Sequence, residues 1–414
     1  MKKIKFLLVF ALLAALMLSA CGKTDDKATS KNGSKEILLW SSTTGPDGDL
    51  IQKNIDQYNA TNPDFKVKLV KMKNDVFGNK LATVTRSGKG VPDIALIASE
   101  SVSTYSSQKM LDSWDNYLKD SKVTSDNYLE EAWNVGTVDG KQYGLPATMG
   151  SWVMYYNKDL VDKYAPGAAD DNIITYAEIE KAAAAAKADG VYAYGFSWPM
   201  QNFNNLYLQM GGKFSEGGKP TIDNEKAVAT FDEFKKLASA GYMNKKGEDT
   251  TMLFKNGKIM FMPEGTWMLA EMNKITNFKW AETFTPQWDA TNLVQGSGAD
   301  QFALFKSKDR SDAKIKSAVK FIEWLQGNQL EWVKSGANPT ALGMLDNQEY
   351  TNMPQSFLLK SDQARKAVTI ITDPGSSYVF GEVDAAAWDI ISGKVDTKEQ
   401  LKKMQQTVND KMNQ

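Results

Sequence analysis

The chain between Glu36 and Ile97 reads EILLWSSTTGPDGDLIQKNIDQYNATNPDFKVKLVKMKNDVFGNKLATVTRSGKGVPDIALI. Short apolar or alternating runs, which are typical of strands, are interleaved there with apolar residues at helical spacing. The order strand-helix-strand-helix-strand predicts a parallel α/β sheet. The expected strands cover 37–40, 65–70 and 93–97, and the expected helices cover 50–59 and 77–86.

The carboxyl ends of these strands mark where a ligand is expected. In open parallel sheets, ligands bind just outside the carboxyl ends of the strands. Here those ends are the loop 41–47, which contains Ser41, Ser42 and Asp47, and the pair Ser99-Glu100. Carboxylates and hydroxyls at this edge are therefore candidate ligand contacts.

The rest of the chain continues to alternate strand and helix patterns. An apolar segment that begins near Gly150 opens a second region, and no internal repeat is visible. The expected strands are 153–156, 192–198 (ending at Trp198-Pro199) and 259–262, and the expected helices are 176–189, 227–240, 313–325 and 398–412.

The N-terminus has the pattern of an export signal. Lys2, Lys3 and Lys5 precede an apolar run over 6–17, and small residues lead to Cys21, the only cysteine of the chain. Twelve apolar residues are too few to span a bilayer. Leu18-Ser19-Ala20-Cys21 resembles a bacterial lipoprotein signal, with Cys21 lipidated and first in the mature chain. The alternative is a plain secretory signal with a chance cysteine.

Composition bounds the function of the mature chain. Removing residues 1–20 leaves 394 of 414 residues, which favours two lobes or domains. Its formal charge of −4 does not favour nucleic acid. The absence of histidine excludes Ser-His-Asp and Cys-His catalysis and His-based zinc sites. Binding without chemistry remains, as does carboxylate catalysis of the glycosidase kind. The polar segment 22–35 is expected to be a flexible tether.

Aromatic residues make up 11% of the sequence, and several of the 11 tryptophans stand at the expected ends of strands and helices. Most aromatics are expected in the core. Those beside glycines and polar residues could instead offer flat faces to a ligand such as a sugar ring.

Four segments together resemble family 1 extracellular solute-binding proteins, the sugar-binding components of ABC importers. Their order and spacing over nearly the whole mature chain carry the resemblance, and the hinge segment is the most specific of them. The segments are Val91-Pro92-Asp93-Ile94; Gly144-Leu145-Pro146 with Tyr156-Asn157-Lys158-Asp159-Leu160 (the hinge); Phe254 to Met260 leading to Gly265-Thr266-Trp267; and Ser392-Gly393 with the helix that follows.

The resemblance implies a type II periplasmic-binding-protein-like fold, with two α/β lobes joined by crossing strands and a ligand cleft between them. Lobe one would be 36–146 plus 300–345, and lobe two 147–299 plus 346–414. The implied partners are a carbohydrate, expected to be an oligosaccharide, and the permease subunits of an ABC transporter. We expect a monomer held on the outer face of the cell membrane by lipid at Cys21, with no cofactor, no metal and no nucleic acid.

Trp267 is the first candidate for ligand contact. It matches the family's tryptophan that stacks on a sugar, and Gly265 would let the backbone come close. A core tryptophan is the alternative. Trp198 and Trp152 could bind ligand or pack in the core, Asn202 and Asn205 are placed in a polar loop after Trp198, and Tyr378 and Phe380 match the family only loosely.

Acidic and hydroxyl side chains complete the candidate set. Carboxylates can accept hydrogen bonds from two sugar hydroxyls at once. Asp300, beside Gly296 and Gly298, is expected in the cleft. Asp47 could instead cap a helix, Glu100 could be a surface charge, and Asp93 is read as structural. The polar candidates are Asp300, Glu100, Asp47, Ser41, Ser42, Asn202 and Asn205.

Three functions compete at this point. The leading hypothesis is a lipid-anchored receptor that captures a sugar and passes it to a permease. The second is a glycoside hydrolase, which would need two acids roughly 5–9.5 Å apart across the cleft. The third is an adhesion or scaffold lipoprotein without a ligand-filled cleft.

Overall fold

The computed structural model describes residues 35–373 and 375–412. Residues 1–34, which contain the predicted export signal, Cys21 and nearly all of the predicted tether, lie outside these ranges. The described residues include no helix both long and apolar enough to cross a membrane. In chain order the elements are β1 (Glu36–Ser41), α2 (Gly45–Ala60), β2 (Lys66–Lys71), α3 (Asn74–Ser87), β3 (Ile94–Ile97), α4 (Ser99–Ser107), β4 (Leu111–Asp112), α5 (Asp115–Leu118), α6 (Glu130–Val135), β5 (Thr137–Val138), β6 (Lys141–Gln142), β7 (Gly144–Asn157), α7 (Lys158–Tyr164), α8 (Tyr176–Ala188), β8 (Tyr192–Tyr194), α9 (Pro199–Gln209), β9 (Ser215–Glu216), β10 (Lys219–Pro220), α10 (Glu225–Ser239), α11 (Thr250–Lys255), β11 (Ile259–Gly265), α12 (Leu269–Met272), β12 (Trp280–Thr283), β13 (Gln295–Phe305), α13 (Asp312–Leu325), α14 (Leu330–Val333), β14 (Asn338–Pro339), α15 (Gln348–Thr351), α16 (Asp362–Ala367), β15 (Val368–Ile370), α17 (Ser376–Ile391) and α18 (Thr397–Met412).

The predicted β-α-β-α-β unit is confirmed. β1 lies between β2 and β3 and is parallel to both, with Leu39 opposite Leu69 and Ile94. β1 and β3 are almost wholly buried, as expected for central strands of a parallel sheet. Asp93, just before β3, accepts a hydrogen bond from the Leu38 N–H at 2.8 Å and pairs with Lys314 at 2.9 Å, which fits its structural reading.

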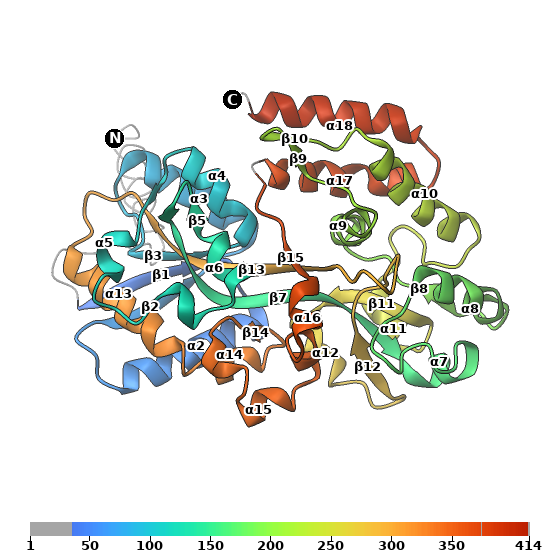
Figure 1. Cartoon of the computed structure of the whole chain (residues 1–414), viewed down its shortest axis with the longest axis horizontal. Helices are drawn as coiled ribbons and strands as arrows, with labels where there is room; N and C mark the ends of the chain where they lie inside the picture. Colours follow the sequence, from blue (N-terminus) through green and yellow to red (C-terminus); the bar gives the residue numbers. More distant parts are fainter. Residues whose placement is uncertain (1–34, 374, 413–414) are drawn as a thin grey trace, which may run out of the picture. The chain divides into compact units, whose positions relative to one another are not determined.

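Two long strands, β7 and β13, connect the two ends of the main sheet. The strand order is β2-β1-β3-β13-β7-β11-β8, so β13 and β7 stand at its middle and pair with each other antiparallel. Figure 1 shows both strands running from the part that contains β1–β3 to the part that contains β8 and β11. β15 crosses beside them, parallel to the first residues of β13. These are crossing strands of the kind that the hinge segment predicts.

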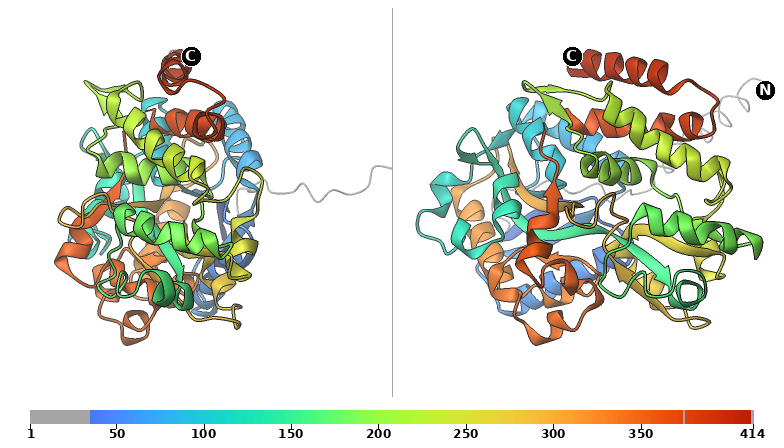
Figure 2. Two further views of the ribbon diagram at one scale, coloured as in Figure 1. Left: turned by 90° about the vertical axis from the view of Figure 1, so that its right-hand side faces the viewer. Right: turned by 45° about the vertical axis from the view of Figure 1, so that its right-hand side comes forward.

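Helices α9, α10, α17 and α18 form a layer beyond β8 and β11. α17 packs against α18, α9 and α10. The two further views in Figure 2 agree with this stacking of α18 over α17. α17 carries buried residues along its whole length, whereas α18 is largely polar and buries Leu401, Met404 and Val408 at helical spacing.

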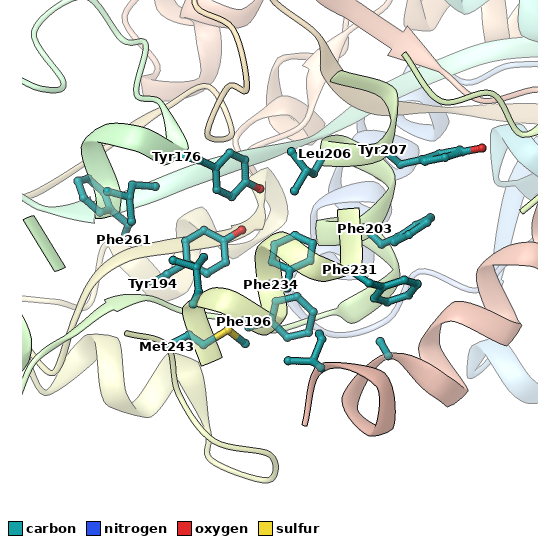
Figure 3. Close-up of a cluster of buried hydrophobic side chains, with 14 of the residues drawn as sticks. Tyr176, Tyr194, Phe196, Phe203, Leu206, Tyr207, Phe231, Phe234, Met243 and Phe261 are labelled. Carbon is teal, nitrogen blue, oxygen red and sulfur yellow. The ribbon is translucent and has the colours of Figure 1, made fainter. Parts of the chain in front are cut away.

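Separate hydrophobic clusters fill the two ends of the molecule. One contains Ile37, Leu96, Phe302 and Phe321 around the parallel strands. The other, here called the aromatic core, surrounds α9 and α10, and Figure 3 shows its rings interleaved. Its largest members are buried aromatics packed mostly edge-on or tilted. They are Tyr176, Tyr194, Phe196, Phe203, Tyr207, Phe214, Phe231 and Phe234.

Three strand predictions differ from the structure in their bounds. β8 ends at Tyr194 instead of Trp198, because the Phe196 N–H is bonded by the Asn244 side chain and Trp198 turns into a left-handed backbone conformation. β11 runs on to Gly265 beyond the predicted end at Met262, since its pairing with β7 continues to Trp152. The predicted strand 153–156 is likewise the end of the longer β7.

Candidate ligand-binding site

A cavity of about 190 Å³ lies where β7 and β13 pass between α4 and α9. Its walls come from segments far apart in the sequence, including the residues directly after β3. This position agrees with the expectation that ligands bind at the carboxyl ends of parallel strands. The lining residues are Ala98, Ser99, Glu100, Gly150, Ser151, Trp152, Met200, Gln201, Asn204, Asn205, Trp267, Gly296, Ser297, Gly298, Asp300, Ile371 and Phe380.

Three tryptophans form a row at this cavity. The ring of Trp152 lies 5.1 Å from that of Trp267 and 6.2 Å from that of Trp198, centroid to centroid. Trp152 is buried, whereas Trp267 is 37% and Trp198 53% exposed. Exposed tryptophan faces beside a cavity are available to a ligand. The alternative reading of Trp267 as a core residue is therefore not supported.

Gly265 and Gly150 make room for the Trp267 ring. A Cβ atom on Gly265 would lie 2.1 Å from ring atoms of Trp267, and one on Gly150 would lie 3.5 Å away. β11 ends at Gly265, and the short 3₁₀ helix Thr266–Met268 then sets the indole against the strand it has just left. The glycine before Trp267 thus serves a close approach of ring to backbone.

Trp198 is held in a strained backbone conformation. Its φ and ψ are 49° and 72°, in the left-handed region that bulky residues rarely occupy, and Pro199 starts α9 directly after it. Its indole N–H donates to Glu264 at 3.1 Å. Burial raises the pKa of Glu264 to about 7, against the hydrogen bonds that it accepts. Backbone strain of this kind is concentrated at functional sites.

Helix α9 presents a polar face to the cavity. The sequence analysis placed this segment in a loop, which is wrong, because apolar packing by Phe203, Leu206 and Tyr207 makes it a helix. In a helix, positions 201, 204 and 205 share one face. The cavity is lined by Gln201, Asn204 and Asn205.

Asn202 points elsewhere. It is buried, accepts a hydrogen bond from the Tyr194 hydroxyl at 2.5 Å and donates to backbone oxygens at the start of α9. Asn205 joins α9 to β13, because its Oδ1 accepts from the Gly296 N–H at 2.8 Å. A Cβ atom on Gly296 would lie 2.8 Å from that same oxygen, which explains the glycine there.

Two buried polar atoms of the lining lack partners. The Oδ1 atom of Asn204 and the indole N–H of Trp152 make no hydrogen bond with the described part of the chain. Both residues are less than 5% exposed. Buried polar groups are nearly always satisfied in native proteins, so an acceptor and a donor left open at one cavity point to a ligand.

Two carboxyl groups, Glu100 and Asp300, line the cavity, and Asp47 lies near them outside the lining. Burial raises the pKa of Asp300 to about 7, and the nearby Glu100 and Asp47 raise it further. Burial also raises the pKa of Glu100, although Glu100 accepts a hydrogen bond from the Ser99 hydroxyl at 3.2 Å. The pKa of Asp47 is about 7, again because of burial. Within residues 35–373 and 375–412, no group of three or more acidic, histidine or cysteine side chains is placed to hold a metal ion.

Six of the predicted ligand contacts line the cavity and six do not. Those that do are Trp267, Asp300, Trp152, Glu100, Asn205 and Phe380, and those that do not are Trp198, Ser41, Ser42, Asp47, Asn202 and Tyr378. Phe380 is almost buried and packs edge-on against Phe214, so it belongs largely to the aromatic core.

The residues outside the lining have other surroundings. Ser41 is buried and its hydroxyl accepts from the Thr43 N–H at 3.0 Å. Asp47 stands in the first turn of α2, where Thr44 is the N-cap, so the reading of Asp47 as the cap is wrong. Tyr378 lies within α17. Glu100 stands in the cavity wall, which is not the outer-surface position considered for it.

Several lining residues were not predicted as ligand contacts. Gln201 and Asn204 were missed because α9 was read as a loop, although helical spacing from Asn205 would have found both. Ser99 was named with Glu100 at the end of the third strand, but only Glu100 was kept as a ligand contact, and Ser297 lies in the glycine-rich segment that contains Asp300. Nothing in the local sequence singles out Ile371.

A second and larger hollow of about 710 Å³ lies away from this cavity, between α8, α10 and the end of α17. Its lining is mainly apolar around Met243, Leu253 and Trp388, with four lysines, and none of the predicted ligand contacts is among it. Among the described residues that line it, there is no exposed tryptophan row and no buried hydrogen-bonding atom without a partner. The smaller cavity is therefore the candidate site.

Comparison with known proteins places these features in context. The model of the family described as bacterial extracellular solute-binding protein matches residues 53–357. The chain is 27% identical over 248 residues to the arabinooligosaccharide-binding protein of Bacillus subtilis (strain 168), covering 56% of this chain and 53% of that protein. It thus spans about half the length of this relative.

A longer alignment and a solved structure extend the similarity. The galactooligosaccharide-binding protein of the same strain is 24% identical over 432 residues, which covers 98% of this chain and 97% of that protein. An ABC substrate-binding protein from Listeria monocytogenes, solved in complex with cycloalternan, superposes with a TM-score of 0.74 at 21% identity, covering 91% of this chain and 99% of that one. The type II two-lobe fold predicted from the sequence is confirmed by this likeness.

Proposed function

The chain belongs to the bacterial extracellular solute-binding proteins, and from that premise we propose that it captures a carbohydrate for an ABC importer. The observation that carries the proposal is the cavity, where the exposed face of Trp267 stands among open hydrogen-bonding groups. Relatives named for oligosaccharide binding support the same ligand class.

The chemistry of the cavity walls suits a sugar ring. A pyranose has apolar faces, which stack on aromatic rings, and hydroxyl groups around its edge. Trp267 offers the aromatic face, while the Asn204 amide and the Asp300 carboxyl can exchange hydrogen bonds with hydroxyls. The indole N–H of Trp152 supplies one more donor.

The size of the cavity favours one ring inside and further rings outside. About 190 Å³ is less than the roughly 300–1,000 Å³ of common ligand pockets. Trp198 stands beside Trp152 just beyond the lining and is more than half exposed. We infer that it forms a second platform, so that an oligosaccharide extends from Trp267 towards Trp198.

We further propose that the lobes divide as 36–146 plus 300–345 and 147–299 plus 346–414. The lining then draws Glu100 and Asp300 from lobe one, and Trp152, Asn204 and Trp267 from lobe two. A ligand that contacts both lobes favours their closure about β7 and β13. X-ray scattering tests this, since closure lowers the radius of gyration; an unchanged radius with saturating sugar contradicts it.

Attachment to the outer face of the cell membrane is proposed through lipid on Cys21. The expected partners are the permease subunits of the importer, and the receptor is expected to act as a monomer. A Cys21→Ala variant should lose membrane retention and keep the folded domain, because the described fold starts after the tether. A variant that stays fully in the membrane fraction after salt washing contradicts the lipid anchor.

Calorimetry with a panel of oligosaccharides, run together with an assay for released sugars, tests the main proposal. Binding without release is expected. Release of shorter sugars would identify a glycoside hydrolase instead, and the absence of both would favour an adhesion or scaffold lipoprotein.

A further inference from the structure

The charged side chains that line the cavity are all acidic. Among the described residues that line it, Glu100 and Asp300 are acidic and none is lysine or arginine. Asp47 lies near enough to raise the pKa of Asp300, and no cation contributes to the pKa of Asp47, Glu100 or Asp300. Glu100 and Asp300 are half-buried, and carboxylates that are partly removed from water are normally paired with a cation or a set of donors. We therefore expect the ligand to supply the group that pairs with the carboxyl groups of Glu100 and Asp300.

Open hydrogen-bond acceptors stand at the same cavity. The carboxyl of Asp300 accepts no hydrogen bond from the described part of the chain, and that of Glu100 accepts hydrogen bonds from its own backbone N–H and from its neighbour Ser99. Asn204 also lines the cavity, and its Oδ1 atom is buried and has no partner in the described part of the chain. An ammonium group has three N–H donors and no acceptor, which matches such a set of acceptors.

Aromatic faces complete the surroundings of a cation. Trp267 and the buried Trp152 line the cavity beside these acceptors. Tryptophan is the aromatic side chain that attracts cations best. The lysines of the larger hollow show the opposite arrangement, since Lys187, Lys245, Lys246 and Lys258 make its lining basic.

We propose that the carbohydrate bound here carries a protonated amine, which lies between the carboxyl groups of Glu100 and Asp300 and the side-chain oxygen of Asn204. The inference rests on the proposed function and names its ligand class: sugars with a free amine are favoured over neutral sugars, and anionic sugars such as uronic acids are rejected. An ammonium supplies the missing positive charge, whereas a carboxylate on the ligand would add to the uncompensated negative charge.

Sets of matched sugars test the proposal. Each set shares one ring and differs at one substituent: a free amine, the N-acetylated amine, or a hydroxyl. Glucosamine, N-acetylglucosamine and glucose form one set, the galactose and mannose series form two more, and short oligomers of each are included. Glucuronic and galacturonic acids serve as anionic members. Titration calorimetry uses the full mature chain at pH 6.5, where the amine is protonated.

The amine member of every set that binds is expected to bind at least tenfold more tightly than its N-acetylated and hydroxyl counterparts. Uronic acids are expected to bind most weakly. A neutral member that binds as tightly as the amine overturns the amine proposal and leaves the proposed function intact. Failure of every sugar to bind contradicts the proposed function itself, and the amine proposal falls with it.

Two isosteric variants sharpen the result. Asp300→Asn and Glu100→Gln keep the shape of the side chain and remove its charge. Each is expected to weaken amine binding about tenfold, as the loss of a charged hydrogen bond does, and to change binding of the hydroxyl counterpart less than twofold. Glu130→Gln, an exposed acid outside the cavity, is the control. Equal losses for amine and hydroxyl sugars in both variants would contradict the proposal.

Proton release gives an independent readout. The titratable groups at this part of the cavity are Asp47, Glu100 and Asp300, with Tyr105 beside Glu100 and Tyr378 beside Tyr105. Since burial raises the pKa of Asp300 to about 7, an ammonium that binds there should displace protons. Calorimetry in two buffers of different ionisation enthalpy should show protons released with the amine sugar and none with its hydroxyl counterpart. No release with a bound amine sugar speaks against the contact.

Discussion

The aromatic core and the tryptophan row are both built from aromatic side chains and both adjoin helix α9, but they differ in exposure and in hydrogen bonding. α9 gives Phe203, Leu206 and Tyr207 to the core and its opposite, polar face to the cavity. Core rings are buried and touch other rings; Phe203 and Phe231 are 4.7 Å apart. In the row, Trp267 and Trp198 keep open faces.

Polar groups show the same contrast. In the core, the Tyr194 hydroxyl donates to Asn202 and the Tyr207 hydroxyl to the Lys213 carbonyl oxygen. At the row, the Trp152 indole N–H has no described partner, and Trp198 holds a left-handed backbone. Buried aromatic residues whose polar groups are hydrogen-bonded stabilise the fold. Aromatic residues with an unpaired polar group or a strained backbone lower the stability of the fold. We therefore expect substitutions in the core to affect stability and substitutions in the row to affect binding.

Phe231→Ala should have the largest effect. The ring is fully buried, so its loss is expected to cost about 3–5 kcal/mol of stability. Urea unfolding measures this, and calorimetry well below the unfolding midpoint should show wild-type affinity in the folded protein. Weakened sugar binding by a folded Phe231→Ala protein would break the separation between core and row.

Trp267→Ala should affect binding in the converse way. Removing an aromatic anchor costs about 2 kcal/mol of binding free energy, roughly thirtyfold in affinity. The melting temperature should change little, because the ring is 37% exposed. Trp288→Ala is the matched control, since Trp288 is also exposed and lies outside the cavity. A sharp fall in melting temperature with unchanged affinity would show that Trp267 acts as a core residue.

Gly265→Ala tests how the row is positioned. The backbone at Gly265 (φ −78°, ψ 149°) accepts alanine, but the new Cβ would meet the Trp267 ring at 2.1 Å. The ring must move, and we expect about a tenfold loss of affinity, which is about 1.4 kcal/mol. Gly78→Ala, where a Cβ meets nothing within 4 Å, should leave affinity unchanged. Full affinity in Gly265→Ala would mean that the position of the ring does not matter.

A pH titration of stability tests one buried acid, Glu282. Burial raises the pKa of Glu282 to about 8, with the Tyr155 hydroxyl opposing it. The folded state therefore holds this proton more tightly than the unfolded chain, and stability present below about pH 4.5 is lost as the pH rises towards 8.

Glu282→Gln should remove part of this loss. We expect the variant to gain up to about 4 kcal/mol over the wild type between pH 5 and pH 8, because each unit of pKa shift is worth about 1.4 kcal/mol and this range lies below the raised pKa of about 8. Melting curves across this range measure it. Parallel pH profiles for wild type and variant would show that Glu282 is not protonated in the folded state.

Much of the fold follows from the sequence pattern, and the exceptions have identifiable causes. β1, β2 and β3 fell within a residue of their predicted bounds, because alternation and apolar runs are local signals. α9 was missed because Asn202, Asn204 and Asn205 have weak helix propensity, and packing of the opposite face stabilises the segment as a helix.

The site could be predicted in part for the same reason. Trp267, Asp300 and Glu100 follow strand ends or glycines, which are visible in the sequence. Gln201 and Asn204 depend on a helix that tertiary contacts create. Ser41 and Asn202 were chosen for their polarity, but internal hydrogen bonds use that polarity.

A crystal structure of the mature chain with the tightest-binding sugar of the panel tests the central claim most directly. The account predicts a sugar ring stacked on the exposed face of Trp267, with polar atoms within hydrogen-bond distance of Asp300 and Asn204. A sugar bound instead in the larger hollow beside Lys187 and Trp388, with the tryptophan row empty, would contradict it.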